Sequence, residues 1–212
     1  MSEILEITIR SIAISSTAVL TSLAWSIPLS LKMISSDSRI TKIFISIANA
    51  LVGFPTVLVG LLVYTILSRS GPLGFLGILY TPLAIIIGEA ILVTPLIISL
   101  LYETLNKARQ TYWELAISLG ADDIQAYYIM LRETIPDIII TALLAFSRAI
   151  GELGVALIVG GNIRGYTRVF TTAIALEISK GDFETALSLG LILFTIVSSI
   201  TIISRLLGAR RE

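Results

Sequence analysis

The 212-residue chain contains no cysteine and no histidine. Without cysteine it can form neither a disulfide nor a thiolate nucleophile, and without histidine it has no imidazole base. The same two residue types supply the usual ligands of zinc and haem iron, so we expect no metal site. These absences exclude most classes of soluble enzyme, and we expect a protein that is not an enzyme.

Charged residues are also scarce. They make up 14% of the chain, whereas about a quarter of the residues in soluble domains are charged. Hydrophobic residues make up 55%, and the mean hydropathy is +0.93. The 15 basic and 15 acidic residues balance, so no basic excess indicates nucleic acid as a partner. This composition is typical of a chain embedded in a lipid bilayer, here as one domain over residues 1–212.

Long runs without charge predict about five membrane-spanning helices, because about 20 apolar residues cross the hydrocarbon core. Glycine and proline interrupt the segment 70–82, where we expect a short interfacial or re-entrant turn, and the apolar run 169–178 is too short to cross. Pro136 is expected in the first turn of its helix. The expected fold class is an all-α polytopic integral membrane protein. The expected spans are 11–31, 43–68, 81–102, 136–160 and 185–204.

Basic residues near the span ends predict the orientation, because cytoplasmic loops carry an excess of lysine and arginine. Nine of them fall on one side and five on the other. This asymmetry predicts that the C-terminus and residues 103–137 are cytoplasmic, and that the N-terminus and residues 162–182 are external. The nine are Lys32, Arg39, Lys42, Lys107, Arg109, Arg132, Arg205, Arg210 and Arg211, and the five are Arg10, Arg69, Arg164, Arg168 and Lys180.

The segment 103–137 is the one substantial stretch outside the expected spans, and it is charged and amphipathic. Glu114 and Gly120 lie about one and a half helical turns apart, and Gly120 is placed to end a helix. We therefore expect a helix, a glycine turn and a second helix in one amphipathic cytoplasmic loop. Such a loop on a membrane protein suggests contact with a soluble partner.

This loop resembles that of ABC importer permeases, whose pattern is Glu-Ala-Ala, three residues, Gly, nine residues and Ile-x-Leu-Pro. The positions that match are Glu114, Ala116 and Gly120. The positions that depart from the pattern are Leu115, Met130, Arg132 and Glu133. The resemblance implies that residues 103–137 dock a cytoplasmic ATPase through the matching positions and the adjoining Ala121.

A second stretch, 147–190, resembles the oxyanion branch of these permeases, whose members carry molybdate, sulfate or tungstate. The pattern is Arg-x-x-Gly-Glu-x-Gly-Ala, then Gly-Asn-Ile and a threonine-rich approach to the last span. The sequence GGNIRGYTRVFTTAIALEISKGDF looks closest to that of tungstate permeases. The residues that fit are Arg148, Gly151, Glu152, Gly154, Gly161, Asn162, Ile163, Thr167 and Thr171.

The resemblance implies a permease subunit of an ATP-driven importer that moves tungstate or molybdate by alternating access, with sulfate as an alternative. The implied partners are a second copy of the chain, two cytoplasmic ATPase subunits, an external substrate-binding protein and the lipid bilayer of a prokaryotic inner membrane. The chain contains no G-x-x-x-x-G-K-[ST] motif. ATP and magnesium are therefore expected on the ATPase, and no cofactor is expected in this chain.

Apart from Asp137 at the start of the fourth span, three charged residues fall inside the expected spans: Glu89, Arg148 and Glu152. Arg148 and Glu152 are spaced i, i+4, so their side chains share one helix face. Charges inside a membrane are costly and usually face a bundle interior or a water-filled path. Two interpretations remain open: a structural ion pair that fixes helix packing, or a gate on an anion path, with Glu89 as a second carboxylate in reach of Arg148.

Two functions from other classes compete with the importer. An ion-coupled secondary anion carrier would use Glu89, Arg148 and Glu152 as a proton relay, although five spans leave no room for an inverted repeat in one chain. A non-transporting membrane scaffold would have no use for an intramembrane Arg–Glu pair. The ABC importer permease is therefore the leading hypothesis.

Overall fold

A computed structural model describes residues 2–35 and 38–209, and all regular structure within these two ranges is helical. Arg210 and Arg211, which entered the count of basic residues, lie outside the described residues. A 3-10 turn at Gly74–Leu76 and a π-helix at Arg109–Trp113 accompany the α-helices. The α-helices are α1 (Ser2–Ile34), α2 (Arg39–Val52), α3 (Thr56–Leu67), α4 (Pro82–Ala108), α5 (Glu114–Ser118), α6 (Asp123–Ile150), α7 (Gly154–Gly160), α8 (Phe170–Lys180) and α9 (Phe183–Ala209).

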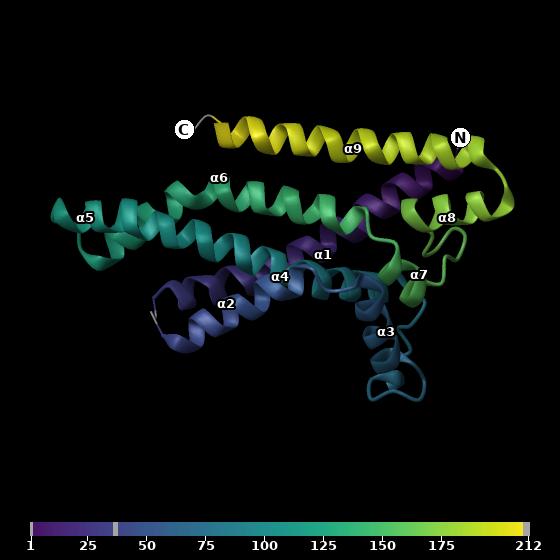
Figure 1. Ribbon diagram of the computed structural model, residues 1–212, viewed down its shortest axis with the longest axis horizontal. Helices are drawn as coiled ribbons and strands as arrows, with labels where there is room; N and C mark the ends of the chain where they lie inside the picture. Colours follow the sequence, from purple (N-terminus) through teal and green to yellow (C-terminus); the bar gives the residue numbers. More distant parts are fainter. Residues whose placement is uncertain (1, 36–37, 210–212) are drawn as a thin grey trace.

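Three helical segments in the described ranges are long and apolar enough to cross a membrane unbroken. They are α1, the continuous helix from Pro82 to Ser118, and α9. Up to two further crossings result if the bent pairs α2–α3 and α6–α7 each count as one. The expected all-α polytopic class is confirmed, and in Figure 1 the helices α4, α6 and α9 run along the long axis of the molecule.

Helix α4 forms the centre of the bundle, because it packs against α1, α2, α3, α6 and α7. Its contact with α1 is the most extensive helix–helix contact. Small residues on the buried face of α1 let helix backbones approach closely. One of them, Ser22, donates from Oγ to the carbonyl of Ala90 on α4 at 3.0 Å. The buried serines of α1 are Ser11, Ser15, Ser22, Ser26 and Ser30.

The second expected span, 43–68, is not one helix. Helix α2 ends at Val52, α3 begins at Thr56, and their axes differ by 103°. Proline supplies no backbone N–H and keeps the preceding residue out of the helical region, so Phe54–Pro55 interrupts the helix. The expected span 43–68 is therefore a bent helix pair, because the single proline outweighs the continuous apolar pattern.

The fourth expected span, 136–160, also differs from the structure. Helix α6 begins at Asp123, so Pro136 lies inside it and not in its first turn. Asp122 starts the helix with a capping box: its Oδ1 accepts from Gln125 N at 2.8 Å, and Gln125 Oε1 accepts from Asp122 N at 3.2 Å. At the other end, residues 151–153 break the span, and α7 continues at 61° to α6.

Residues 103–137 are the outer ends of α4 and α6 together with the π-helix and α5, in place of a loop set apart from the spans. The expected helix, glycine turn and helix are present, because α5 precedes Gly120 and α6 follows it. Figure 1 shows this hairpin and the end of α9 at one end of the molecule, with the N-terminal end of α1, α7 and α8 at the other. This arrangement agrees with the sides assigned from the basic residues.

The orientation itself stays a prediction that cysteine labelling can test. Ser118 and Ser179 are both exposed, and they lie at opposite ends of the molecule. In this cysteine-free chain, we expect an impermeant thiol reagent applied to the external side of vesicles to label Ser179→Cys and not Ser118→Cys. Ser22→Cys, at a fully buried position, is the unlabelled control. Labelling of both exposed positions from outside would overturn the predicted topology.

Candidate functional site

Glu152 lies in the break between α6 and α7, with a side chain only 4% exposed. Its Oε1 accepts hydrogen bonds from the backbone N–H groups of Gly154 at 2.9 Å and Val155 at 3.3 Å. These N–H groups open α7 and have no partner within that helix, so the carboxylate caps it. The break therefore places a buried carboxylate at the start of a short helix.

Arg148 forms the ion pair that its i, i+4 spacing from Glu152 allows, with Nη1 3.0 Å from Glu152 Oε2. The two side chains meet although Gly151 has already ended the helix between them. The Arg148 side chain is 39% exposed, and it lines an open cavity of about 560 Å³ together with Glu152, Thr56 and Leu157. A cationic group thus faces a hollow whose other walls are largely apolar, where it can attract an anion.

Glu89 lies on α4, 2% exposed, beside Ser15 of α1 and within electrostatic range of Glu152. The sequence left open whether Arg148 pairs with Glu89 or with Glu152, and the structure shows the pair with Glu152. Among the described residues, Glu89 Oε2 has no hydrogen-bond partner. Glu89 is therefore a buried carboxyl group behind the Arg148 pair and does not line the 560 Å³ cavity.

The second group of expected site residues lies at the tip of the α4–α6 hairpin. Gly120 has φ +90°, a left-handed conformation that favours glycine. Its N–H donates to the carbonyl of Ile117 at 3.0 Å, and the N–H of Ala121 donates to the carbonyl of Ala116 at 3.0 Å. These two bonds form a Schellman motif, so Gly120 ends α5 as expected. Glu114 is exposed at the start of α5, and Ala116 is buried.

The hairpin also carries an exposed apolar patch that the sequence reasoning missed. The side chains of Leu115, Leu119, Ile124 and Tyr128 are between 55% and 82% exposed. An apolar patch outside the membrane-spanning segments, bordered by charges, marks a contact surface for another protein. The signal in the sequence was the amphipathic pattern on both sides of Gly120, but only the fold shows that both sides expose their apolar residues.

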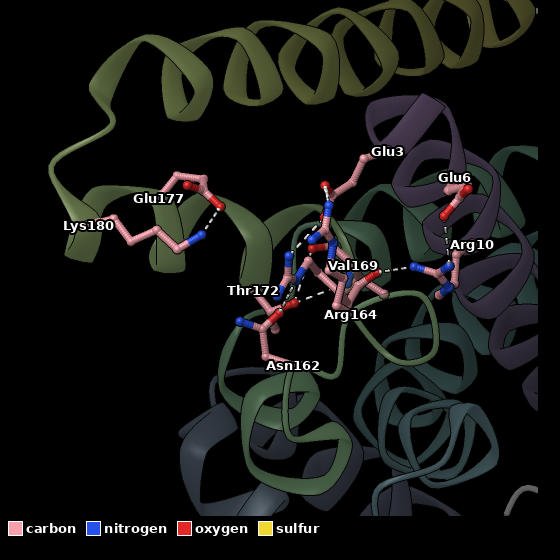
Figure 2. Close-up of polar contacts among 10 residues, drawn as sticks. Glu3, Glu6, Arg10, Asn162, Arg164, Val169, Thr172, Glu177 and Lys180 are labelled. Carbon is pink, nitrogen blue, oxygen red and sulfur yellow. Dashed lines mark hydrogen bonds and ion pairs between the residues drawn. The ribbon is translucent and has the colours of Figure 1, made fainter. Parts of the chain in front are cut away.

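An ion cluster at the opposite end was also missed. Glu3 of α1 accepts from Arg164 Nη2 at 2.6 Å and from Arg168 Nη1 at 2.9 Å, and Arg168 Nε donates to Asn162 Oδ1 at 3.3 Å. Arg10 donates to the backbone carbonyl of Arg168 at 3.0 Å. Figure 2 shows how these groups join the N-terminal end of α1 to the loop before α8. The partners are about 160 residues apart in sequence, so no local pattern indicates them.

Comparison with known proteins decides the class of this molecule. Residues 15–212 match the family described as binding-protein-dependent transport system inner membrane component. The chain belongs to this family. It is therefore a multi-pass membrane subunit of an ABC transport system and not an enzyme, as the sequence predicted. The secondary carrier and the non-transporting scaffold are set aside on the same ground.

Individual relatives are named as permeases for anions. The chain is 44% identical over 187 residues to the tungstate uptake system permease protein of Peptoclostridium acidaminophilum, covering 88% of this chain and 82% of that protein. It is 37% identical over 212 residues to a probable anion ABC transporter permease protein of Haloferax volcanii, covering 98% and 90%. A sulfate transport system permease protein of Salmonella typhimurium is 30% identical over 139 residues, 62% of this chain and 50% of that protein.

The Arg148–Glu152 pair gives a prediction that separates a gate from a packing device. Arg148→Ala leaves the buried Glu152 carboxylate without its cation, and we expect a loss of about 1–3 kcal/mol, less than for a fully buried pair because Arg148 is partly exposed. Arg148→Ala with Glu152→Gln removes both charges, and we expect it to recover most of the thermal stability in detergent. If the pair is a gate, the double variant is expected to transport poorly despite its recovered stability. Transport by the double variant at the wild-type rate would show that the pair has only a packing role.

Proposed function

We propose that this chain is the permease subunit of an ATP-driven importer for a tetrahedral oxyanion, with tungstate as the substrate. The observation that carries the proposal is Arg148, a cation that lines a hollow within the membrane-spanning region and is fixed by a buried carboxylate. An intramembrane charge held in this way is typical of a substrate or ion path. The proposal agrees with the names of the relatives, which are permeases for tungstate, sulfate or an unspecified anion.

Tungstate is favoured over sulfate by the extent of the similarity. The tungstate relative shares 44% of residues across most of both chains, whereas the sulfate relative shares 30% across about half of its own length. Molybdate has nearly the same shape and charge as tungstate, so a site that admits one ion is expected to admit the other.

Partial neutralisation of Arg148 by Glu152 favours passage of an anion over its tight binding. An anion path must attract its ion and also release it, and a free guanidinium in low dielectric would hold a dianion strongly. Glu152 reduces this attraction while it also caps α7. Because the pair spans the break between α6 and α7, a change in the bend between these helices would change how much of Arg148 faces the hollow.

Surfaces of the molecule support two of the implied partners. The 560 Å³ hollow opens at the surface of the chain, and we propose that a second copy closes it off from lipid. The tip of the α4–α6 hairpin offers a contact surface for one ATPase subunit on each copy. This surface consists of Glu114 and the patch of Leu115, Leu119, Ile124 and Tyr128. ATP and magnesium then act on the ATPase, and this chain needs no cofactor. An external binding protein delivers the oxyanion.

Transport by reconstituted vesicles tests the proposal through Gly120. We expect vesicles that hold the chain, its ATPase and its binding protein to take up tungstate only when ATP is supplied. Gly120→Val is expected to lower this uptake at least tenfold, because a β-branched residue at φ +90° costs about 1–3 kcal/mol and displaces α5.

The matched control is Gly120→Asn, since asparagine tolerates left-handed backbone better than other side chains. A Cβ at this position meets no atom within 4 Å, so the two variants differ in backbone preference and not in fit. Near-normal uptake is expected for Gly120→Asn. Normal uptake by a well-assembled Gly120→Val variant contradicts the coupling role, and uptake driven by an ion gradient without the ATPase contradicts the proposed function.

A further inference from the structure

A polar cavity of about 410 Å³ lies where the ends of α1 and α2 meet the end of α4. It is separate from the Arg148 hollow, with which it shares no lining residue. Its walls carry two cationic side chains, two amides and a phenol, all hydrogen-bond donors, and a single carboxylate. These residues are Lys42, Arg109, Asn106, Gln110, Tyr102 and Glu114.

Arg109 is held in place at this cavity by a neutral acceptor. It is the first residue of the π-helix, and its Nη1 donates to the backbone carbonyl of Ile34 at the end of α1. Because that partner carries no charge, the contact fixes the guanidinium without neutralising it. Within residues 2–35 and 38–209, its four further N–H groups remain for other acceptors. π-Helical turns occur frequently at functional sites, where they redirect a side chain.

The cavity is expected to lie at the depth of lipid headgroups. Tyr102 is the last residue of the expected third span, and tyrosine is enriched at the membrane interface. Arg109 follows two helical turns later, at the base of the hairpin. Basic pockets between the cytoplasmic ends of membrane helices are a recognised binding mode for the phosphate groups of anionic lipids.

A polar cavity at the opposite end of the molecule shows that cationic side chains in a cavity wall do not by themselves make an anion site. That cavity, of about 450 Å³, contains Arg164, Arg168 and Lys180. Glu3 pairs with both arginines, and Glu177 pairs with Lys180 at 2.8 Å. The external cavity is therefore neutralised by its own carboxylates, whereas the guanidinium of Arg109 is held by a carbonyl.

We propose that the 410 Å³ cavity binds a tetrahedral oxyanion group at Arg109, Asn106 and Gln110. The phosphate of an anionic phospholipid and a free oxyanion that has reached the cytoplasmic side share this chemistry. Arginine suits it because its planar fork binds phosphate-like groups through two parallel hydrogen bonds. The inference rests on the proposed function only in placing this end of the molecule on the cytoplasmic side. Binding to the cavity needs neither the ATPase nor transport.

An occupant of this cavity would act on the hairpin. Glu114, the first residue of α5, lines the cavity, and Arg109 touches the end of α1. A bound anion would therefore hold the ends of α1 and α4 together beside the surface proposed to contact the ATPase. Occupancy would bias the position of α5 and so regulate coupling from the membrane surface.

Fluorescence of Trp113 reports on this cavity, because Trp113 and Arg109 line an adjoining hollow of about 210 Å³. The chain has one other tryptophan, so Trp25→Phe leaves Trp113 as the single emitter. The full chain in detergent is titrated with short-chain phosphatidylglycerol, with phosphatidylcholine of the same chain length, with inorganic phosphate and with tungstate. We expect a saturable change with phosphatidylglycerol or with a free oxyanion, and none with phosphatidylcholine.

Two cavity variants and one matched control complete the test. Arg109→Gln removes the charge, and Asn106→Leu keeps the contact between Arg109 and Ile34, so loss of fold cannot explain a shared effect. Each variant is expected to raise the half-saturating concentration of the anionic probe about tenfold or more. Lys107→Gln, which removes an exposed charge two residues away, is expected to leave half-saturation unchanged.

The choice of probe identifies the source of the anion. Saturation by phosphatidylglycerol alone assigns the cavity to a lipid headgroup, and saturation by phosphate or tungstate assigns it to a free oxyanion. The proposal is overturned if no anionic probe saturates, if phosphatidylcholine saturates equally well, or if all variants share one half-saturation point.

Discussion

The Glu152 carboxylate makes two kinds of hydrogen bond at once, and the geometry of the candidate site depends on both. One oxygen caps the backbone of α7, and the other pairs with Arg148 at 3.0 Å. A charged carboxylate is costly to bury in a membrane protein, and both contacts offset this cost for Glu152. The result is a fixed bend in the membrane-spanning region, with a guanidinium on its open side. The proposed oxyanion path and the bend therefore share one residue.

Helix α6 links this bend to the surface proposed to meet the ATPase. It runs from Asp123, just after the Gly120 turn, to Ile150, just before the break, a length of about 42 Å. Helix α6 is continuous over this length and packs against α4 and α9, and we propose that it transmits a displacement from one end to the other. Displacement of α5 at one end would thus change the environment of Arg148 at the other. This connection provides a physical route for alternating access in a chain that has no nucleotide motif of its own.

The sequence was informative where the signal was local. Uncharged runs predicted the membrane class, the i, i+4 spacing placed Arg148 and Glu152 on one helix face where they can pair, and Gly120 was identified as the end of a helix. It did not give the size of the bend at Pro55, and it failed where a capping box started a helix 13 residues before Pro136. Contacts between distant segments, such as Glu3 with Arg168, arise from the packing of α1 beside the loop before α8 and leave no local trace.

Accessibility of Leu157 is the most direct test that the Arg148 hollow lies on the oxyanion path. Leu157 lines the hollow and is 45% exposed, and the chain has no native cysteine. A negatively charged thiol reagent is expected to modify Leu157→Cys in the assembled transporter during ATP turnover. Tungstate delivered by the binding protein is expected to slow this modification, and the protection is expected to disappear when Arg148 is replaced by alanine. A modification rate that does not respond to tungstate would contradict the account.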